Sequence, residues 1–246
     1  MPYTMLDPDK IIKTADILET RVSERFPNAS LVGVAEELKA IAIDAKARAE
    51  KLSEPIQWLR VATFASVFVG IMVFFFIGTF LNFDRIATGA FDFVQGIEAT
   101  INAVVLAGLG FITIAKSEER IKRRKVLDGL HGLRSVIHII DMHQLTKDPV
   151  SLRTGFKPTP SSPERKLTPN ELVRYLDYCS EMLSLTGKIS ALYAQAVPDM
   201  EVVNAVNDVE ALGGNLSRKI WQKIMLIEPD KVTRSSKLVT SRKAKT

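Results

Sequence analysis

The chain has 246 residues and a formal net charge of +5 at neutral pH, with one cysteine and three histidines. A single cysteine excludes an intramolecular disulfide and a metal site built from several thiolates. The positive charge is concentrated in residues 229–246, which carry six basic side chains and one acidic side chain. Because the rest of the chain is nearly neutral, we expect no nucleic-acid partner.

Residues 1–57 are expected to form two amphipathic helices on the cytoplasmic side of a membrane. Asp7 and Pro8 mark the first start, since aspartate caps helices and proline is favoured at the first helical position. Pro27 ends this helix, and a second one is predicted over residues 31–52. An apolar stripe at helical spacing lies along the first helix: Ile11, Ile12, Ala15, Leu18, Val22 and Phe26.

Residues 61–81, VATFASVFVGIMVFFFIGTFL, contain no ionisable side chain. At a rise of ~1.5 Å per residue, such a helix reaches ~30 Å, which is the thickness of a bilayer's hydrocarbon core. A helix in the core of a soluble protein seldom stays apolar on every face for this length. The stretch therefore predicts a transmembrane helix.

Residues 99–115 form a second uncharged stretch, at the short end of the spanning range of ~17–25 residues. The alternatives are a buried soluble helix and a re-entrant segment. A basic run starts at Lys116, as is typical of a membrane boundary. We therefore predict a two-helix transmembrane hairpin over residues 58–115, with spans of about 61–81 and 99–115.

Lysine and arginine placement predicts the orientation of this hairpin. Basic residues precede the first span and follow the second, whereas the connection contains only Arg85 among three acidic residues. By the positive-inside rule, both termini are expected in the cytoplasm, most simply at a bacterial inner (plasma) membrane. The chain start has no apolar signal region, so we expect no cleavable signal peptide.

Small residues at four-residue spacing predict close helix packing, either within the hairpin or between copies of the chain. Asn102 is the strongly polar side chain inside the second span. It predicts an interhelical hydrogen bond or, together with Glu98, the lining of a pore. The small-residue faces consist of Ala62, Ser66 and Gly70 in the first span and Ala99, Ala103 and Ala107 in the second.

A long helix is predicted to leave the membrane over residues 116–146. Its apolar residues repeat at steps of three and four, in the manner of a coiled coil, and therefore need a partner helix. This seam consists of Val126, Leu130, Leu133, Ile137 and Ile140.

The same helix carries the most chemically suggestive cluster of the chain. His131, Arg134, His138 and Asp141 are spaced three, four and three, so they share one face. Three interpretations stay open. The first is a partly buried polar network that fixes helix register. The second is a metal site using His131, His138 and Asp141, although two helical turns separate the histidines. The third is a pH sensor or proton-coupled gate.

Residues 147–167 are proline-rich and predict a linker. Residues 168–228 predict a helical hairpin, because Thr168 and Glu171 form a capping box around Pro169. Gly213 and Gly214 indicate a kink or a close helix contact in its second helix, while Cys179 in the first is expected to be a buried small hydrophobe. Residues 229–246 are expected to be a disordered basic tail, which either is a solvated segment that aids solubility or contacts anionic lipid.

The sequence thus predicts an all-α membrane protein, with a two-helix transmembrane hairpin attached to a cytoplasmic helical bundle. Motifs for an enzyme, a metal site or a cofactor are missing, so we expect none of these. The expected function is a membrane-anchored helical interaction or scaffold protein that self-associates or binds an unidentified protein partner. The alternative is a homo-oligomeric pore or channel, since this layout is similar to the two-span effector modules of bacterial defence systems, the SLATT-like group.

Overall fold

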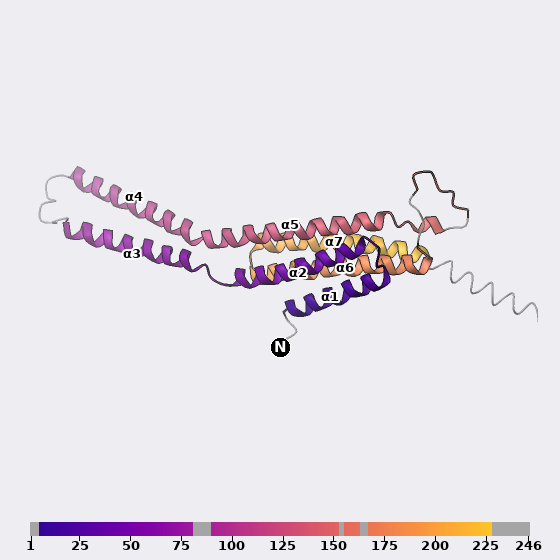
Figure 1. The fold of residues 1–246 in the computed structure, drawn as a ribbon. Helices are drawn as coiled ribbons and strands as arrows, with labels where there is room; N and C mark the ends of the chain where they lie inside the picture. The colour runs from indigo at the N-terminus through magenta and orange to yellow at the C-terminus, as the bar shows by residue number, and fades with distance from the viewer. Residues whose placement is uncertain (1–4, 81–89, 153–154, 163–166, 228–246) are drawn as a thin grey trace, which may run out of the picture. The chain divides into compact units, whose positions relative to one another are not determined.

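The computed structural model describes residues 5–80, 90–152, 155–162 and 167–227. Within these ranges every regular element is a helix and there is no strand, as predicted (Figure 1). Several side chains of the two apolar helices, Ala103 among them, also lie outside the described set. The prediction of a disordered, lipid-binding tail at residues 229–246 falls outside the described residues.

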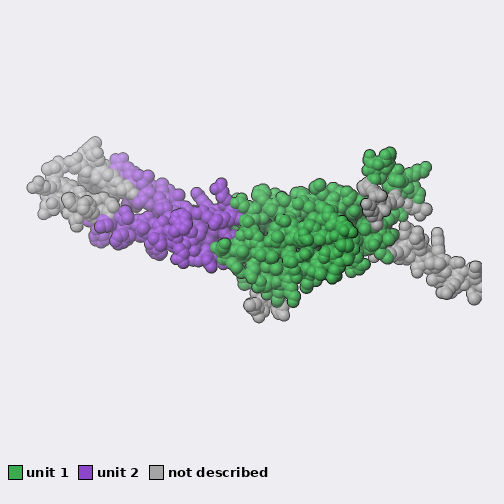
Figure 2. Space-filling view, viewed as in Figure 1, with its two compact units in different colours: residues 1–51, 126–246 green, residues 52–125 purple. Residues whose placement is uncertain are grey.

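The chain divides into two compact units, coloured separately in Figure 2. Residues 1–51 and 126–246 form the first, called here the bundle, and residues 52–125 form the second, called here the apolar pair. The bundle contains most of α2 and α5 together with α1, α6 and α7. The helix bounds are α1 Pro8–Arg25, α2 Leu31–Ser53, α3 Gln57–Phe80, α4 Ala90–Ala115, α5 Ser117–Leu145, α6 Pro169–Ala196 and α7 Met200–Ile227, with a short 3₁₀ helix η2 at Pro149–Leu152.

Helix α6 forms the core of the bundle, because fourteen of its 28 residues are buried and they lie on several faces. Its start is the predicted capping box. The Glu171 amide donates to the Thr168 hydroxyl at 3.3 Å, and the Thr168 amide donates to the Glu171 carboxylate at 2.7 Å. Cys179 is fully buried in this helix, as expected. The hydroxyls of Thr186 and Ser190, also buried, donate to carbonyls of the preceding turn at 2.9 and 2.8 Å.

Helices α6 and α7 pack against each other along their length, and three residues, 197–199, join them. The last two helices therefore lie against each other. Gly213 lies inside α7, which continues without a break. A Cβ atom there would lie 3.5 Å from the Leu183 carbonyl oxygen and 3.8 Å from Ile137 Cδ1. Gly213 therefore marks a close helix contact, whereas a Cβ atom at Gly214 would meet open space.

The apolar seam of α5 is buried in full, with each of its five predicted residues at most 4% exposed. Its partners are α6 and α7. Gly129 lies against Tyr193 of α6, so that a Cβ atom there would be only 2.6 Å from the tyrosine Oη. The partner helices that the seam requires are thus supplied by the chain itself.

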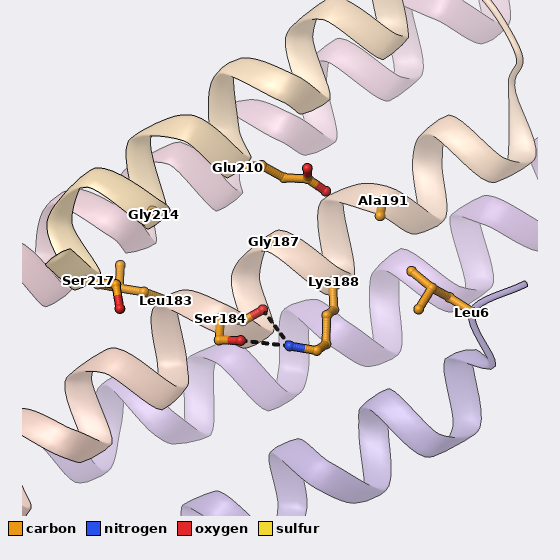
Figure 3. A pocket seen from close by; sticks show the side chains of 10 residues that line it. Leu6, Leu183, Ser184, Gly187, Lys188, Ala191, Glu210, Gly214 and Ser217 are labelled. Carbon is orange, nitrogen blue, oxygen red and sulfur yellow. Dashed lines mark hydrogen bonds between the residues drawn. The ribbon is translucent and has the colours of Figure 1, made fainter.

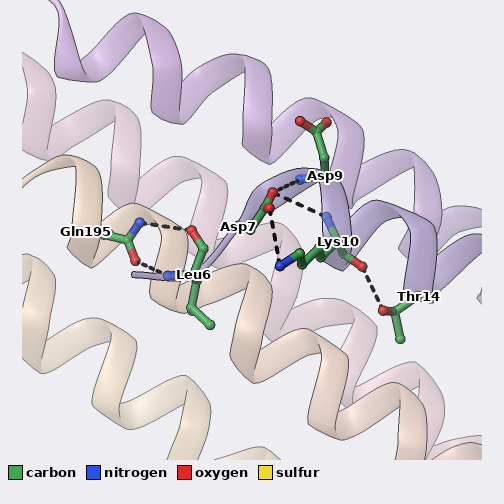
Figure 4. A network of polar contacts seen from close by, with 6 residues as sticks. All are labelled: Leu6, Asp7, Asp9, Lys10, Thr14 and Gln195. Carbon is green, nitrogen blue, oxygen red and sulfur yellow. Dashed lines mark hydrogen bonds and ion pairs between the residues drawn. The ribbon is translucent and has the colours of Figure 1, made fainter. Parts of the chain in front are cut away.

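Helix α1 starts at the predicted cap, where Asp7 Oδ1 accepts from the backbone amides of Asp9 and Lys10 at 3.0 and 3.4 Å (Figure 4). The residue before this cap is attached to α6. The Gln195 side-chain amide accepts from the Leu6 amide at 3.0 Å and donates to the Leu6 carbonyl at 3.1 Å. These two bonds satisfy the backbone amide and carbonyl groups of Leu6, which lies before the helix.

In the apolar pair, α3 and α4 contact each other. Helix α4 begins at Ala90, earlier than the predicted second span. Among the residues that the structure describes, one stretch, Leu31–Met72, which takes in α2 and the first part of α3, is long and apolar enough to cross a membrane. The most apolar part of this stretch is only 6% buried, unlike the core helix of a soluble protein. A membrane-spanning role for α4 stays a prediction.

Candidate functional site

The histidine stripe lies at the surface of the bundle. His131, Arg134 and His138 are exposed, and Asp141 is half-buried. The prediction that the stripe is partly buried beside the seam is therefore wrong for the first three residues. They are rotated by about 80–140° from the centre of the seam, since each residue advances a helix by about 100°. Within the described chain no group of side chains is arranged to hold a metal ion.

A buried polar network forms one turn further along α5, around Gln144, which is 2% exposed. Its Nε2 donates to Asp141 Oδ1 at 2.5 Å. Lys223 of α7 donates to the Gln144 side-chain and backbone oxygens at 2.5 and 2.9 Å. Of the four stripe residues, only Asp141 belongs to this network. Gln144 lies four residues after Ile140 and therefore on the same helix face as the seam. This spacing is the sequence signal that indicates its burial.

Burial in this region changes the chemistry of two side chains. Desolvation lowers the pKa of Lys223, although Asp148 and Asp141 act in the opposite direction. Desolvation raises the pKa of the Cys179 thiol to about 12, against smaller opposing effects of Lys147 and Lys223. Cys179 is therefore a protonated, buried group at neutral pH and not an activated nucleophile.

The surface of the apolar pair differs sharply from that of the bundle. Phe64 is 75% exposed on α3, and Leu106 is 70% exposed on α4. Many neighbouring apolar side chains are also largely exposed. They are Val61, Phe68, Val69, Ile71, Met72, Phe75, Ile101, Val104, Val105, Leu109 and Ile112. Isolated exposed apolar residues are ordinary, but a continuous surface of this kind marks an interaction with a membrane or another protein.

The small residues of the predicted packing faces occupy different environments. Ala62 and Ser66 are half-buried on α3, while Gly70 is exposed, and a Cβ atom at Gly70 would meet nothing. On α4, Ala107 is exposed, and Ala103 is among the residues whose side chains are not described. On the small-residue face of the first span, Ala62 and Ser66 are thus partly covered, whereas Gly70 is open.

Hydroxyl groups in these helices bond to their own backbone. Thr63 donates to the Leu59 carbonyl, Ser66 to the Thr63 carbonyl and Thr113 to the Leu109 carbonyl, each at 2.8 Å. Such bonds satisfy hydroxyls without a partner helix, which suits an apolar environment. Asn102 and Glu98 are exposed one turn apart on α4.

One acidic residue, Glu118, connects the residue before α3 to the start of α5. The Glu118 carboxylate accepts from the Ile56 amide at 3.1 Å and pairs with Lys122 at 3.0 Å. Lys122 is the main cause of the lowered pKa of Glu118, the Ile56 amide adds to it, and desolvation opposes both. This connection, called here the Glu118 lock, holds the start of α3 beside the start of α5. No pattern in the sequence indicates it, because Ile56 and Glu118 are 62 positions apart in the chain.

No family model, curated protein or solved structure matches this chain. Its function must therefore be inferred from its own geometry.

The bundle has two adjoining hollows beside Leu6 and Lys188. One, of about 350 Å³, lies between α6 and α7 (Figure 3). The other, of about 640 Å³, lies between α1 and α6. Lys188 bonds to the Ser184 hydroxyl and carbonyl at 2.6 and 3.3 Å, so its ammonium group is already engaged within α6. Both hollows are open grooves, unlike an enclosed small-molecule site.

Proposed function

We propose that this protein is a membrane-anchored helical scaffold in which α3 and α4 form a transmembrane hairpin and the bundle is a cytoplasmic interaction unit. The observation that carries the proposal is the continuous exposed apolar surface of the apolar pair. In water such a surface would cost roughly 25 cal/mol per Å², and lipid removes that cost without requiring a buried core.

The internally satisfied hydroxyls of Thr63, Ser66 and Thr113 support the same proposal. A lipid-facing helix has no water to complete its hydrogen bonds, so every polar group must find a partner inside the protein. The bundle, by contrast, buries its apolar seams within itself and needs no membrane to fold. It is therefore suited to presenting fixed helix surfaces to a second copy or to another protein.

Fractionation of cells that produce the full chain tests the anchor. The protein should stay in the membrane pellet after an alkaline carbonate wash and be released by detergent. Replacing Phe64 and Phe68 by aspartate should move it to the soluble fraction, because a carboxylate near a helix centre costs roughly 2.5–3.5 kcal/mol on insertion.

The matched control replaces Ile17 and Ile43 by aspartate. These residues are also exposed, at 48% and 49%, but lie in the bundle. This variant should remain in the membrane. Recovery of the unmodified chain in the wash would refute the anchor, and mass photometry in nanodiscs would show whether the anchored protein self-associates.

A homo-oligomeric pore is the second candidate, and the exposure of Glu98 and Asn102 on one face of α4 favours it. Polar side chains that face the outside of a helix pair suit a water-filled path formed by several copies. Liposomes containing the protein should then conduct ions, and Asn102→Leu should reduce the flux while Leu106→Ala, at an exposed apolar site, should not. Silent liposomes that contain correctly inserted protein would eliminate this candidate.

A further inference from the structure

We propose that the base of the apolar pair is a binding surface for anionic phospholipid headgroups, formed by Arg60, Lys116 and Arg120. These three side chains are called here the cationic collar. The proposal rests on the proposed membrane anchor and goes beyond it, because it names the lipid class that the anchor selects and the residues that select it.

The start of α3 and the end of α4 lie at a common level within the apolar pair. The Glu118 lock joins Ile56 to Glu118, and the start of α3 lies beside the end of α4 within this unit (Figure 1). Trp58 and Lys116 each lie two residues from the lock, in the direction of the apolar segments. At ~1.5 Å per residue, both are about 3 Å above it, and therefore at one height.

The surface of both helices changes from charged to apolar near this level. On α3, Trp58 is 64% exposed and Arg60 is exposed, and an exposed apolar surface begins with Val61. On α4, Ile112 is 50% exposed and Lys116 follows it as an exposed cation. An interfacial tryptophan beside lysine and arginine is the pattern of a membrane–water boundary. The structure thus places the pattern on both helices at one level.

Two residues of the collar, Lys116 and Arg120, are aligned along one side of α4 and α5. The Lys116 amide donates to the Ile112 carbonyl at 3.0 Å, and the Arg120 amide donates to the Lys116 carbonyl at 3.2 Å. The helical bonding therefore continues through the junction, and Lys116 and Arg120 lie on the same side, about 6 Å apart along the axis. That spacing keeps both ammonium and guanidinium groups within the headgroup layer, where long basic side chains extend toward phosphates.

The positive charge of the collar exceeds the negative charge of the acidic residues beside it. Lys122 is half-buried and engaged by Glu118, so it belongs to the lock. Arg60 also interacts electrostatically with Glu118, and the exposed acid Glu119 offsets a further cation. Because the cations Arg60, Lys116, Arg120 and Lys122 outnumber these two acids, the surface stays net positive. Arginine binds phosphate oxygens in a bidentate manner, and lysine acts as a point charge. A lipid with a net negative headgroup satisfies these cations, whereas a zwitterionic lipid brings its own competing ammonium.

Spin-labelled lipids added to the reconstituted full-length protein test the proposal. Labelled phosphatidylglycerol should associate with the protein roughly fivefold more strongly than labelled phosphatidylcholine, which corresponds to about 1 kcal/mol for one cation near a charged surface. The preference should vanish in 1 M salt, where the Debye length is ~3 Å. It should also vanish in the variant Arg60→Gln/Lys116→Gln/Arg120→Gln.

The matched control is Lys13→Gln/Lys157→Gln/Lys219→Gln, which removes three exposed cations of the other unit and makes the same change in net charge. It should keep the lipid preference. Equal association of both lipids with the unmodified protein, or an equal loss in the control, would overturn the collar while leaving the anchor intact. Absence of any motionally restricted lipid would instead refute the anchor itself. The salt series uses the unmodified chain, so the test does not depend on folding of the variants.

Discussion

The bundle and the apolar pair use similar side chains for opposite purposes. In the bundle, Ile137 of α5 and Leu176 of α6 have no exposed surface, because neighbouring helices cover them. In the apolar pair, Phe68 remains 67% exposed, although phenylalanine is at least as apolar. The hydrophobic effect drives the first arrangement, while an exposed apolar surface like the second is typical of a site of interaction with a membrane or another protein. The comparison shows that burial within the chain, and not apolar content, distinguishes a core helix from an anchor.

The largest test of this comparison truncates one apolar side chain in each unit. Leu176→Ala should lower the free energy of unfolding of the bundle by about 2–5 kcal/mol, since it removes buried contacts and leaves a cavity. Phe68→Ala should change it by less than about 0.5 kcal/mol. Denaturant unfolding in nanodiscs, followed by circular dichroism, measures both. A comparable loss in Phe68→Ala would show that α3 packs into a protein core.

Two glycines of α5 sharpen the comparison within one helix. Gly129→Ala should destabilise the bundle by about 1–3 kcal/mol, because the added methyl group would overlap the buried Tyr193 ring. Gly132→Ala meets no atom within 4 Å, so it should stabilise the helix by up to about 1 kcal/mol. Thermal unfolding of the two variants gives the contrast. Equal shifts of the same sign would mean that α5 does not contact α6 at Gly129.

Burial in the bundle also has an alkaline signature. The Cys179 thiol ionises near pH 9 when unfolded, but near pH 12 in the folded protein. Above pH 9 the folded state therefore holds a proton that the unfolded state has lost. The free energy of unfolding should fall with rising pH, by at most about 1.4 kcal/mol per unit from this group.

Unfolding of the protein and of Cys179→Ala at pH 8, 9 and 10, under reducing conditions, measures this dependence. The stability advantage of the unmodified protein should be constant below pH 9 and shrink above it. A gap that stays constant up to pH 10 would contradict the assignment, since Tyr175, whose pKa burial also raises, is present in both proteins.

The smallest expected effect concerns a partly exposed contact between α1 and α6. Arg21 donates to both Glu181 oxygens, at 2.8 and 3.1 Å, and lies over the Tyr178 ring at 5.2 Å. Because both charged side chains are about one-third exposed, the pair should contribute only about 0.2–1 kcal/mol. A double-mutant cycle with Arg21→Gln and Glu181→Gln measures it, and a coupling of several kcal/mol would show a much drier contact.

Local sequence signals predicted much of the fold. Asp7 with Pro8 and Thr168 with Glu171 cap helices by bonds within four residues, so the sequence contains all that these starts require. The α5 seam was equally predictable, because its spacing of three and four allows only one buried face. The same spacing places His131 and His138 outside the core, contrary to the expectation of a partly buried stripe, since each follows a seam residue and is rotated by about 100° from it.

The Glu118 lock and the Gln144 network required the tertiary structure. Each joins residues far apart in the chain. Glu118 bonds to Ile56 and Gln144 bonds to Lys223. No periodicity within one helix indicates such a partner, because the pairing depends on how whole helices are placed. The cationic collar is intermediate, since the sequence shows its charges, while the lock shows that the start of α3 lies beside the start of α5.

The sequence by itself determined the helices, their caps, the buried seam of α5 and the apolar character of α3 and α4, because each depends on contacts within a few turns. Only the tertiary structure decided which apolar faces are covered. It buried α6 among its neighbours and left Phe64, Phe68 and Leu106 open, because coverage is a property of neighbouring helices and not of any segment alone.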